Sequence, residues 1–140
     1  MPPTPGPGEV QVRMAFASIC GYDMIMLRGT AAYPLNGYLG HEGSGVVTAV
    51  GENVRALHPG DRVTINPYEP CGLCDACRSN RPEYCTNPSV GYADLMTEYL
   101  NIRQQQVFRL PEQVSLRAGS LIEPLMMAMH AISKARLDWG

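Results

Sequence analysis

The sequence predicts a small, mainly β domain, a barrel or a sandwich, with one helix near its C-terminus. Short segments of strand-forming residues recur between positions 9 and 110, and turns rich in Gly and Pro separate them. The chain has 140 residues, of which 45% are hydrophobic and 17% are charged. This length and composition are sufficient for one domain with a hydrophobic core.

The first predicted strand covers residues 9–16. Its apolar side chains alternate along the segment, which places them on one buried face: Val10, Val12, Met14 and Phe16. Residues 1–8 contain four prolines and two glycines and are therefore predicted to be irregular.

Residues 21–40 are predicted to be mostly irregular, with a short helical turn near Asp23–Leu27. The stretch GHEGSG at 40–45 is interpreted as a glycine-rich turn. Four further strands are predicted after it: Val46–Val50, Arg62–Asn66, Thr97–Asn101 and Val107–Leu110.

The C-terminal part changes character. Residues 111–119 are predicted to form a turn and a short helix, and Pro124, a residue favoured at the first helical position, begins a helix over 124–137. His130 is expected to be a packing or polar-edge residue of this helix, and His58 is expected to face solvent. Three methionines of the helix are expected to pack in the core: Met126, Met127 and Met129.

Composition argues against several functions. The formal net charge is −2, and no basic patch or basic helix predicts binding to nucleic acid or to a membrane surface. The sequence has no run of 18 apolar residues, and its N-terminus lacks the features of a signal peptide. We therefore expect a cytoplasmic protein, in a reducing compartment where cysteine clusters are more often metal sites than disulfides.

Four cysteines lie within fifteen residues and are spaced C-x2-C-x2-C-x7-C: Cys71, Cys74, Cys77 and Cys85. Four thiolates can bind a tetrahedral Zn2+, which offsets their mutual repulsion. Two disulfides are an alternative, although spacings this short suit few pairings. An iron–sulfur cluster is another, although its usual motif places the fourth cysteine after three residues. Redox sensing by the thiols is a third. We predict a structural zinc in a lobe at 68–87.

A second set of candidate ligands lies outside the lobe. Cys20 follows the first strand, His41 and Glu42 lie in the glycine-rich turn, and Glu123 directly precedes the C-terminal helix. Singly, these residues have ordinary interpretations as a core thiol, a polar turn and a helix cap. Together they could bind a second zinc with one position open to substrate.

Six motifs occur in a fixed order along the chain: PGPGEV at 5–10, ICGYD at 19–23, GHEGSGVV at 40–47, GDRV at 60–63, the cysteine lobe, and IEPL at 122–125. In these motifs the chain resembles the N-terminal domain of zinc-containing medium-chain alcohol dehydrogenases. The combination of IEPL with a following His-Ala is similar to the sorbitol, polyol and threonine dehydrogenase branch, because the classical alcohol branch has a cysteine at the position of Glu123.

The resemblance implies a GroES-like β-barrel over residues 1–118, with 119–140 as a linker and helix leading to a nucleotide-binding domain. It implies two zinc ions per chain, the catalytic one bound by Cys20 and His41. Glu42 would be the third ligand or its alternate, and Glu123 a ligand or a partner of the metal-bound water. The implied activity is NAD- or NADP-dependent oxidation of a secondary alcohol or polyol through a zinc alkoxide. A homo-oligomer would also be consistent with the family.

The chain departs from the family pattern in three ways. The β-strands that normally precede PGPGEV in the family are absent from this sequence, so an exposed sheet edge is expected. Tyr22 replaces the Ser or Thr that relays the alcohol proton, and Ile25 replaces a frequent histidine. No G-x-G-x-x-G turn occurs between a strand and a helix, so we predict no Rossmann domain within these residues and expect the chain alone to be inactive. The alternative function is a stand-alone zinc-binding or interaction module derived from a dehydrogenase.

Overall fold

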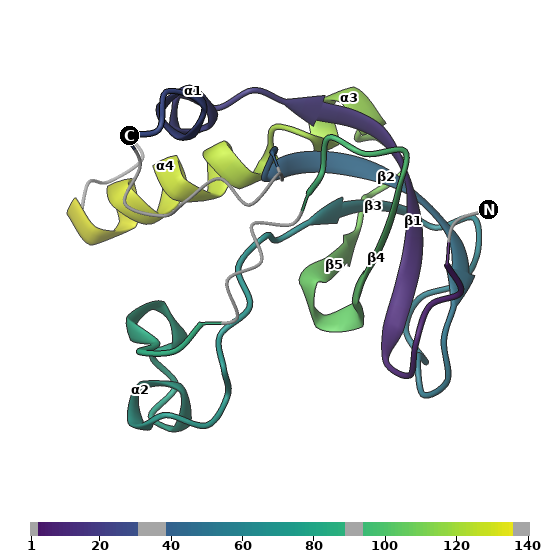
Figure 1. The fold of residues 1–140 in the computed structure, drawn as a ribbon, viewed down its shortest axis with the longest axis horizontal. Coiled ribbons are helices and arrows are strands. Elements are labelled where there is room, and N and C mark those ends of the chain that lie inside the picture. The colour runs from purple at the N-terminus through teal and green to yellow at the C-terminus, as the bar shows by residue number, and fades with distance from the viewer. Residues whose placement is uncertain (1–2, 31–38, 89–93, 136–140) are drawn as a thin grey trace.

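The computed structural model describes residues 3–30, 39–88 and 94–135 (Figure 1). Five strands form one antiparallel sheet in the order β4-β1-β2-β3-β5. Their bounds are β1 Glu9–Ser18, β2 Glu42–Val50, β3 Arg62–Ile65, β4 Tyr99–Arg103 and β5 Val107–Arg109. The prediction of a mainly β domain is confirmed.

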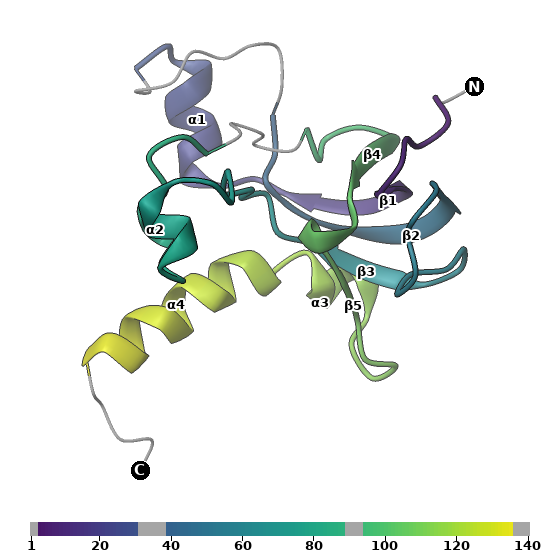
Figure 2. The ribbon, with the colours of Figure 1, turned by 90° about the horizontal axis from the view of Figure 1, so that it is seen from below.

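Short helices connect the strands: α1 Gly21–Leu27, α2 Asp75–Arg78, α3 Leu116–Gly119 and the 3-10 helices η1 Pro82–Tyr84 and η2 Gln104–Gln106. One longer helix, α4, covers Ile122–Ala135. Figures 1 and 2 both show α1, α2 and α4 on the same side of the molecule, beyond one end of the sheet. No helix among the described residues is long and apolar enough to cross a membrane.

The two edge strands of the sheet, β4 and β5, are consecutive in sequence and are joined only by the three residues of η2. An extended residue spans at most about 3.6 Å, so this short link keeps the end of β4 close to the start of β5. The sheet therefore has to curl toward a barrel.

The core lies inside the curl of the sheet. Its buried members come from all five strands and two connecting loops: Val10, Val12, Val47, Leu57, Val63, Ile65, Leu95, Ile102 and Val107. Full burial of a side chain of this size stabilises the fold by about 1.5–3 kcal/mol. The first half of β1 confirms the predicted buried face at Val10 and Val12.

The second half of β1 does not follow that prediction, because Phe16 is 44% exposed. The pairing of β1 with β4 covers only Glu9–Arg13, and its register with β2 shifts between Met14 and Phe16. The alternation therefore breaks where β1 loses its outer neighbour.

The predicted glycine-rich turn at 40–45 is wrong from Glu42 onward, because β2 begins there. Gly45 lies inside the strand, where an added Cβ would clash with the carbonyl oxygen of Arg13 and approach Val12 Cγ1 to 2.7 Å. Glycine is needed here for the close approach of β1 to β2, since any side chain would push the two strands apart.

Helix α4 begins at Ile122, two residues earlier than predicted, so Pro124 lies within its first turn. Proline is tolerated there because the first four N–H groups have no intrahelical acceptor. The predicted helix end at 137 lies outside the described residues.

The prediction that the α4 methionines pack in the core is also wrong. Met126, Met127 and Met129 are 46%, 59% and 52% exposed, and α4 has no buried residue. His130 is exposed as well, and the side chain of His58 is exposed as predicted.

Candidate metal centres

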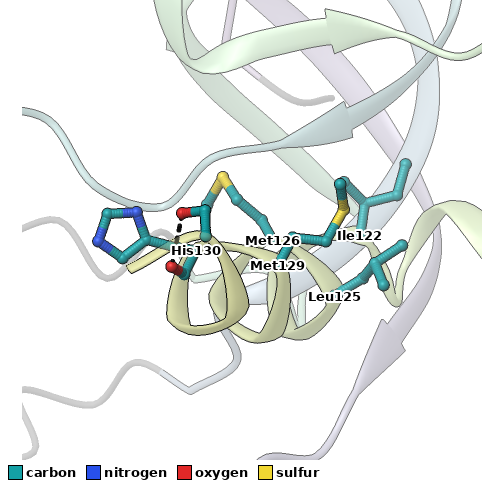
Figure 3. A pocket seen from close by; sticks show the side chains of 6 residues that line it. Ile122, Leu125, Met126, Met129 and His130 are labelled. Carbon is teal, nitrogen blue, oxygen red and sulfur yellow. Dashed lines mark hydrogen bonds between the residues drawn. The ribbon is translucent and has the colours of Figure 1, made fainter. Parts of the chain in front are cut away.

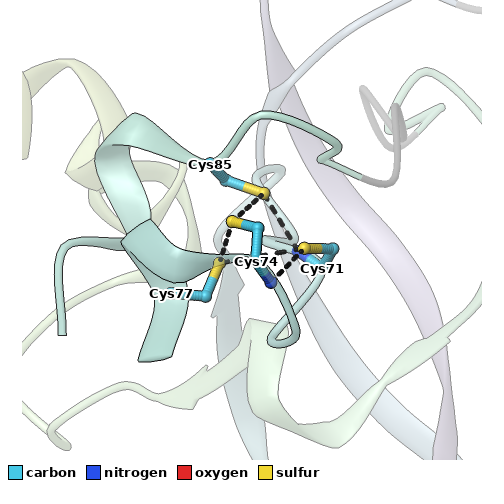
Figure 4. Close-up of side chains that lie close together, drawn as sticks. All are labelled: Cys71, Cys74, Cys77 and Cys85. Carbon is cyan, nitrogen blue, oxygen red and sulfur yellow. Dashed lines mark hydrogen bonds between the residues drawn. The ribbon is translucent and has the colours of Figure 1, made fainter. Parts of the chain in front are cut away.

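The four lobe cysteines converge on one point, as Figure 4 shows. Their sulfur atoms all lie within 4.8 Å of one another, with 3.5 Å between Cys74 and Cys77, 3.9 Å between Cys74 and Cys85, and 4.0 Å between Cys71 and Cys77. Tetrahedral Zn–S bonds of about 2.3 Å place sulfurs about 3.8 Å apart. The donor set therefore fits zinc, and all four cysteines are free thiols, which does not support the disulfide alternative.

Backbone N–H groups support negative charge in this cluster. The amide of Cys71 donates to Cys85 Sγ at 3.3 Å, and the amide of Cys74 donates to Cys71 Sγ at 3.4 Å. Backbone hydrogen bonds lower the pKa of the Cys74 thiol to about 6, whereas desolvation and the hydrogen bond with Cys74 raise the pKa of Cys77 to about 12. Ionisation of Cys77 near neutral pH is therefore favoured when a cation balances the negative charge of the cluster.

A second cluster forms where α1 meets the start of β2. One ligand atom each of Cys20, His41 and Glu42 lies within 4.8 Å of the others. The pairing of Ser18 with Glu42 at the end of the β1–β2 ladder brings the segments together. His41 and Glu42 are each only 6% exposed. A thiolate, an imidazole and a carboxylate form a donor set suited to zinc with a fourth position open.

Asp23 is a further residue of this site that our sequence analysis did not identify. Its Oδ2 accepts a 2.7 Å hydrogen bond from the amide of Cys20, which is the N-cap of α1. Its buried Oδ1 has no hydrogen bond but lies 3.3 Å from His41 Nδ1. The contact is thus close enough for electrostatic attraction but poorly aligned for a hydrogen bond. Asp23 can orient His41 through Nδ1 and leave Nε2 for a metal.

Glu123, in the first turn of α4, lies beside the second cluster rather than within it. Burial raises the pKa of its carboxyl group, the charge of Glu42 raises it further, and His41 lowers it. The three side chains are therefore within electrostatic range of one another. The structure brings together Cys20, His41 and Glu42 and places Glu123 at their border.

The raised pKa of Glu123 predicts a pH effect on the metal-free chain. The folded state holds this proton more tightly than the unfolded state, so its contribution to stability is lost as pH rises through the raised pKa. With EDTA present, we expect the unfolding free energy of the wild type to decrease relative to that of Glu123→Gln as pH rises above 4.5, the ordinary pKa of a glutamate. Urea unfolding measures this, with exposed Glu112→Gln as the control. Parallel pH curves for the wild type and Glu123→Gln would contradict the assignment.

Two other features border the cluster. The half-buried ring of Tyr22 meets the ring of His41 edge-on, with centroids 6.5 Å apart and planes inclined by 74°. An open apolar groove of about 400 Å³ runs along α4 (Figure 3) and is lined by Ile122, Leu125, Met126, Met129, His130 and Ser133. The groove includes none of the candidate metal ligands.

A curled antiparallel sheet, a four-cysteine lobe, and a Cys–His–Glu cluster at one end of the sheet together define a GroES-like domain with candidate metal centres. The chain belongs to the alcohol dehydrogenase family, because the family model described as "Alcohol dehydrogenase GroES-like domain" matches residues 6–112. The resemblance derived from the sequence motifs is confirmed.

Several of the similar proteins are named as alcohol or polyol dehydrogenases. Galactitol 1-phosphate 5-dehydrogenase of Escherichia coli K12 is 35% identical over 137 residues, which cover 91% of this chain and 38% of that protein. The structure of an alcohol dehydrogenase (rspB) from E. coli CFT073 with NADH has a TM-score of 0.83 and 36% identity, covering 94% of this chain and 40% of that one. A Sinorhizobium meliloti 1021 structure is described as a zinc-binding dehydrogenase bound to NADP. It has a TM-score of 0.83 and 31% identity, and the match covers 94% of this chain and 39% of that one. The chain spans about two fifths of the length of the curated relatives it matches.

Proposed function

We propose that this chain is the zinc-binding catalytic domain of an NAD- or NADP-dependent dehydrogenase that oxidises a secondary alcohol or polyol. The observation that carries the proposal is the second cluster, in which ligand atoms of Cys20, His41 and Glu42 lie within 4.8 Å of one another. Three protein ligands with an open fourth position are typical of catalytic zinc sites, whereas the four cysteines of the lobe suit a closed structural site.

Each residue of the second cluster has a distinct role in this proposal. Cys20 and His41 hold the ion, Glu42 is the third ligand, and Asp23 orients His41. Bound zinc supplies Lewis acidity that lowers the pKa of an alcohol. Glu123, whose pKa is raised, can receive a proton at its carboxylate near the open position. Tyr22, in edge-on contact with His41, is proposed to relay the alcohol proton through its hydroxyl group.

The substrate class and the cofactor are proposed from the relatives. Galactitol 1-phosphate 5-dehydrogenase is named for a polyol phosphate, and the two similar crystal structures contain NADH and NADP. The choice between NAD and NADP depends on residues that contact the ribose of the cofactor. A homo-oligomeric state stays a prediction.

Metal analysis of the purified chain tests this function. We expect two zinc ions per wild-type chain and about one in Cys20→Ser, because that variant loses a ligand of the second cluster but keeps all four lobe thiolates. Cys85→Ser is the matched control: it should lose the lobe ion and keep the other. An unchanged zinc content in Cys20→Ser would refute the second metal centre and the catalytic function built on it.

A further inference from the structure

A buried network of hydroxyl groups connects the sheet to the turn between α3 and α4. Thr64 Oγ1, on β3, lies 3.0 Å from the carbonyl oxygen of Gly119 and 3.3 Å from that of Gly43, so its proton bridges the end of α3 and β2. Ser44 Oγ, on β2, donates to the carbonyl oxygen of Leu116 in α3. Thr64 and Ser44 are only 6% and 0% exposed.

Ser120 extends the network to β1. This residue lies between α3 and α4 and is 4% exposed. Its hydroxyl donates to the carbonyl oxygen of Arg117 at 2.9 Å and lies 3.2 Å from the hydroxyl of Ser18, at the end of β1. Three strands are thereby joined to the segment that leads into α4.

The network adjoins the proposed catalytic site along the chain. Several residues of the network are close in sequence to residues of that site: Ser18 is close to Cys20, Gly43 and Ser44 are close to Glu42, and Ser120 is close to Glu123. These segments are distant from one another in sequence and meet through the sheet and the hydroxyl groups. A shift of the α3–α4 turn would therefore move Glu123 relative to the Cys20–His41–Glu42 cluster.

Packing around the turn leaves little space for such a shift. A Cβ atom added to Gly119 would come within 2.6 Å of Leu110 Cδ1 and 3.3 Å of Ser44 Cβ. Buried carbonyl groups such as those of Gly43 and Gly119 require hydrogen-bond partners, and the hydroxyl of Thr64 serves both. The hydroxyl groups thus fix the turn in both distance and orientation.

We propose that Thr64 and Ser44 are positioning residues, which fix the α3–α4 turn on the sheet and thereby hold Glu123 beside the Cys20–His41–Glu42 cluster. This inference rests on the proposed function. A purely structural role would instead make these hydroxyl groups matter for overall stability alone. The two roles predict different effects on metal binding.

Thr64→Val is the principal test, because valine keeps the shape and strand preference of threonine and removes the hydroxyl. We expect about a tenfold loss of Co2+ affinity at the second cluster, measured through the Cys20–Co2+ charge-transfer absorption, with no change at the lobe. Val63→Ala is the control for stability, since it opens the core beside Thr64 without touching the network. Thr48→Val is the control for loss of a strand hydroxyl elsewhere. Equal losses in Thr64→Val and Val63→Ala, or no loss in Thr64→Val, would overturn the inference.

A double-mutant cycle tests whether the effect passes through Glu123. If the network acts by holding this carboxylate, Thr64→Val should change Co2+ affinity much less in a Glu123→Gln background than in the wild type. An undiminished effect in that background would overturn the stated role of the network.

Amide hydrogen exchange of the metal-free chain provides a readout that does not depend on the proposed function. We expect Thr64→Val, but not Thr48→Val, to speed exchange of the amides of Ser120 and Leu121. These amides donate to the carbonyl oxygens of Leu116 and Ala118 in α3. Unchanged exchange would refute the network. A wild-type chain that binds no metal at the second cluster would refute the proposed function, while the exchange result would still decide whether the network holds the turn.

Discussion

Removal of zinc from the cysteine lobe is expected to unfold residues 68–87 while the sheet stays folded. The lobe contains one four-residue helix and one 3-10 turn, and neither has a buried residue. Its large apolar side chains face outward, with Leu73 80% and Tyr84 67% exposed. Metal binding has to replace the missing core, and structural zinc contributes about 10–16 kcal/mol in small zinc domains.

Limited trypsin digestion followed by mass spectrometry measures this effect. Cleavage after Arg78 should accelerate strongly in Cys74→Ser or after chelation, whereas the lobe of Cys20→Ser should stay protected. Two contacts outside the metal cluster restrain the lobe: a 3.0 Å ion pair between Glu69 and Arg103, and a 2.8 Å hydrogen bond from the Tyr68 hydroxyl to the Pro82 carbonyl. If the lobe of Cys74→Ser stays protected from trypsin, these contacts are sufficient to keep it folded, and zinc is not the main source of its stability.

Asp23→Ala is expected to weaken metal binding at the second cluster by about 10- to 100-fold. The carboxylate has two roles at once, since one oxygen accepts from the amide of Cys20 and the other lies 3.3 Å from His41 Nδ1. Its removal frees the imidazole to rotate and leaves the amide of Cys20 without its acceptor. The measurement is Zn2+ competition against a chromophoric chelator.

Asp61→Ala is a close control for Asp23→Ala. Asp61 Oδ2 also accepts from the amide of the residue three positions earlier, His58, at 2.8 Å, and lies 4.0 Å from its Nδ1. The His58 side chain is 70% exposed, and neither residue belongs to a candidate metal cluster, so loss of this pair should leave metal affinity unchanged. Equal affinities in Asp23→Ala and Asp61→Ala would rule out the orienting role of Asp23.

The fold class and the lobe could be predicted from sequence because both depend on local patterns. The second cluster was harder to predict, since it depends on the pairing of Ser18 with Glu42 across two strands. Asp23 did leave a local signal. The Cys20-x-x-Asp23 spacing matches a capping box, in which the side chain at the third helical position returns to the N-cap amide.

Other predictions failed because a local pattern had a different structural cause. The glycines of GHEGSG are typical of a turn. Gly45 instead lies in β2, where β1 packs too closely for a side chain, and the sequence does not show that these two strands are neighbours. The apolar sequence of α4 is typical of a buried helix, yet the described part of the chain covers little of its surface. Periodicity indicates which residues share a face, but it does not indicate what packs against that face.

The strand order has a consequence for synthesis of the protein. β1 is made first but pairs with β4, and Gln11 reaches its partner Asn101 only after the intervening chain has been translated. Translation proceeds at about 5–20 residues per second, so several seconds pass between the synthesis of β1 and the synthesis of β4. The lobe can complete its ligand set within the fifteen residues from Cys71 to Cys85. We therefore expect the nascent chain to acquire metal at the lobe before the sheet closes, and to be most prone to aggregation while Val10 and Val12 await coverage.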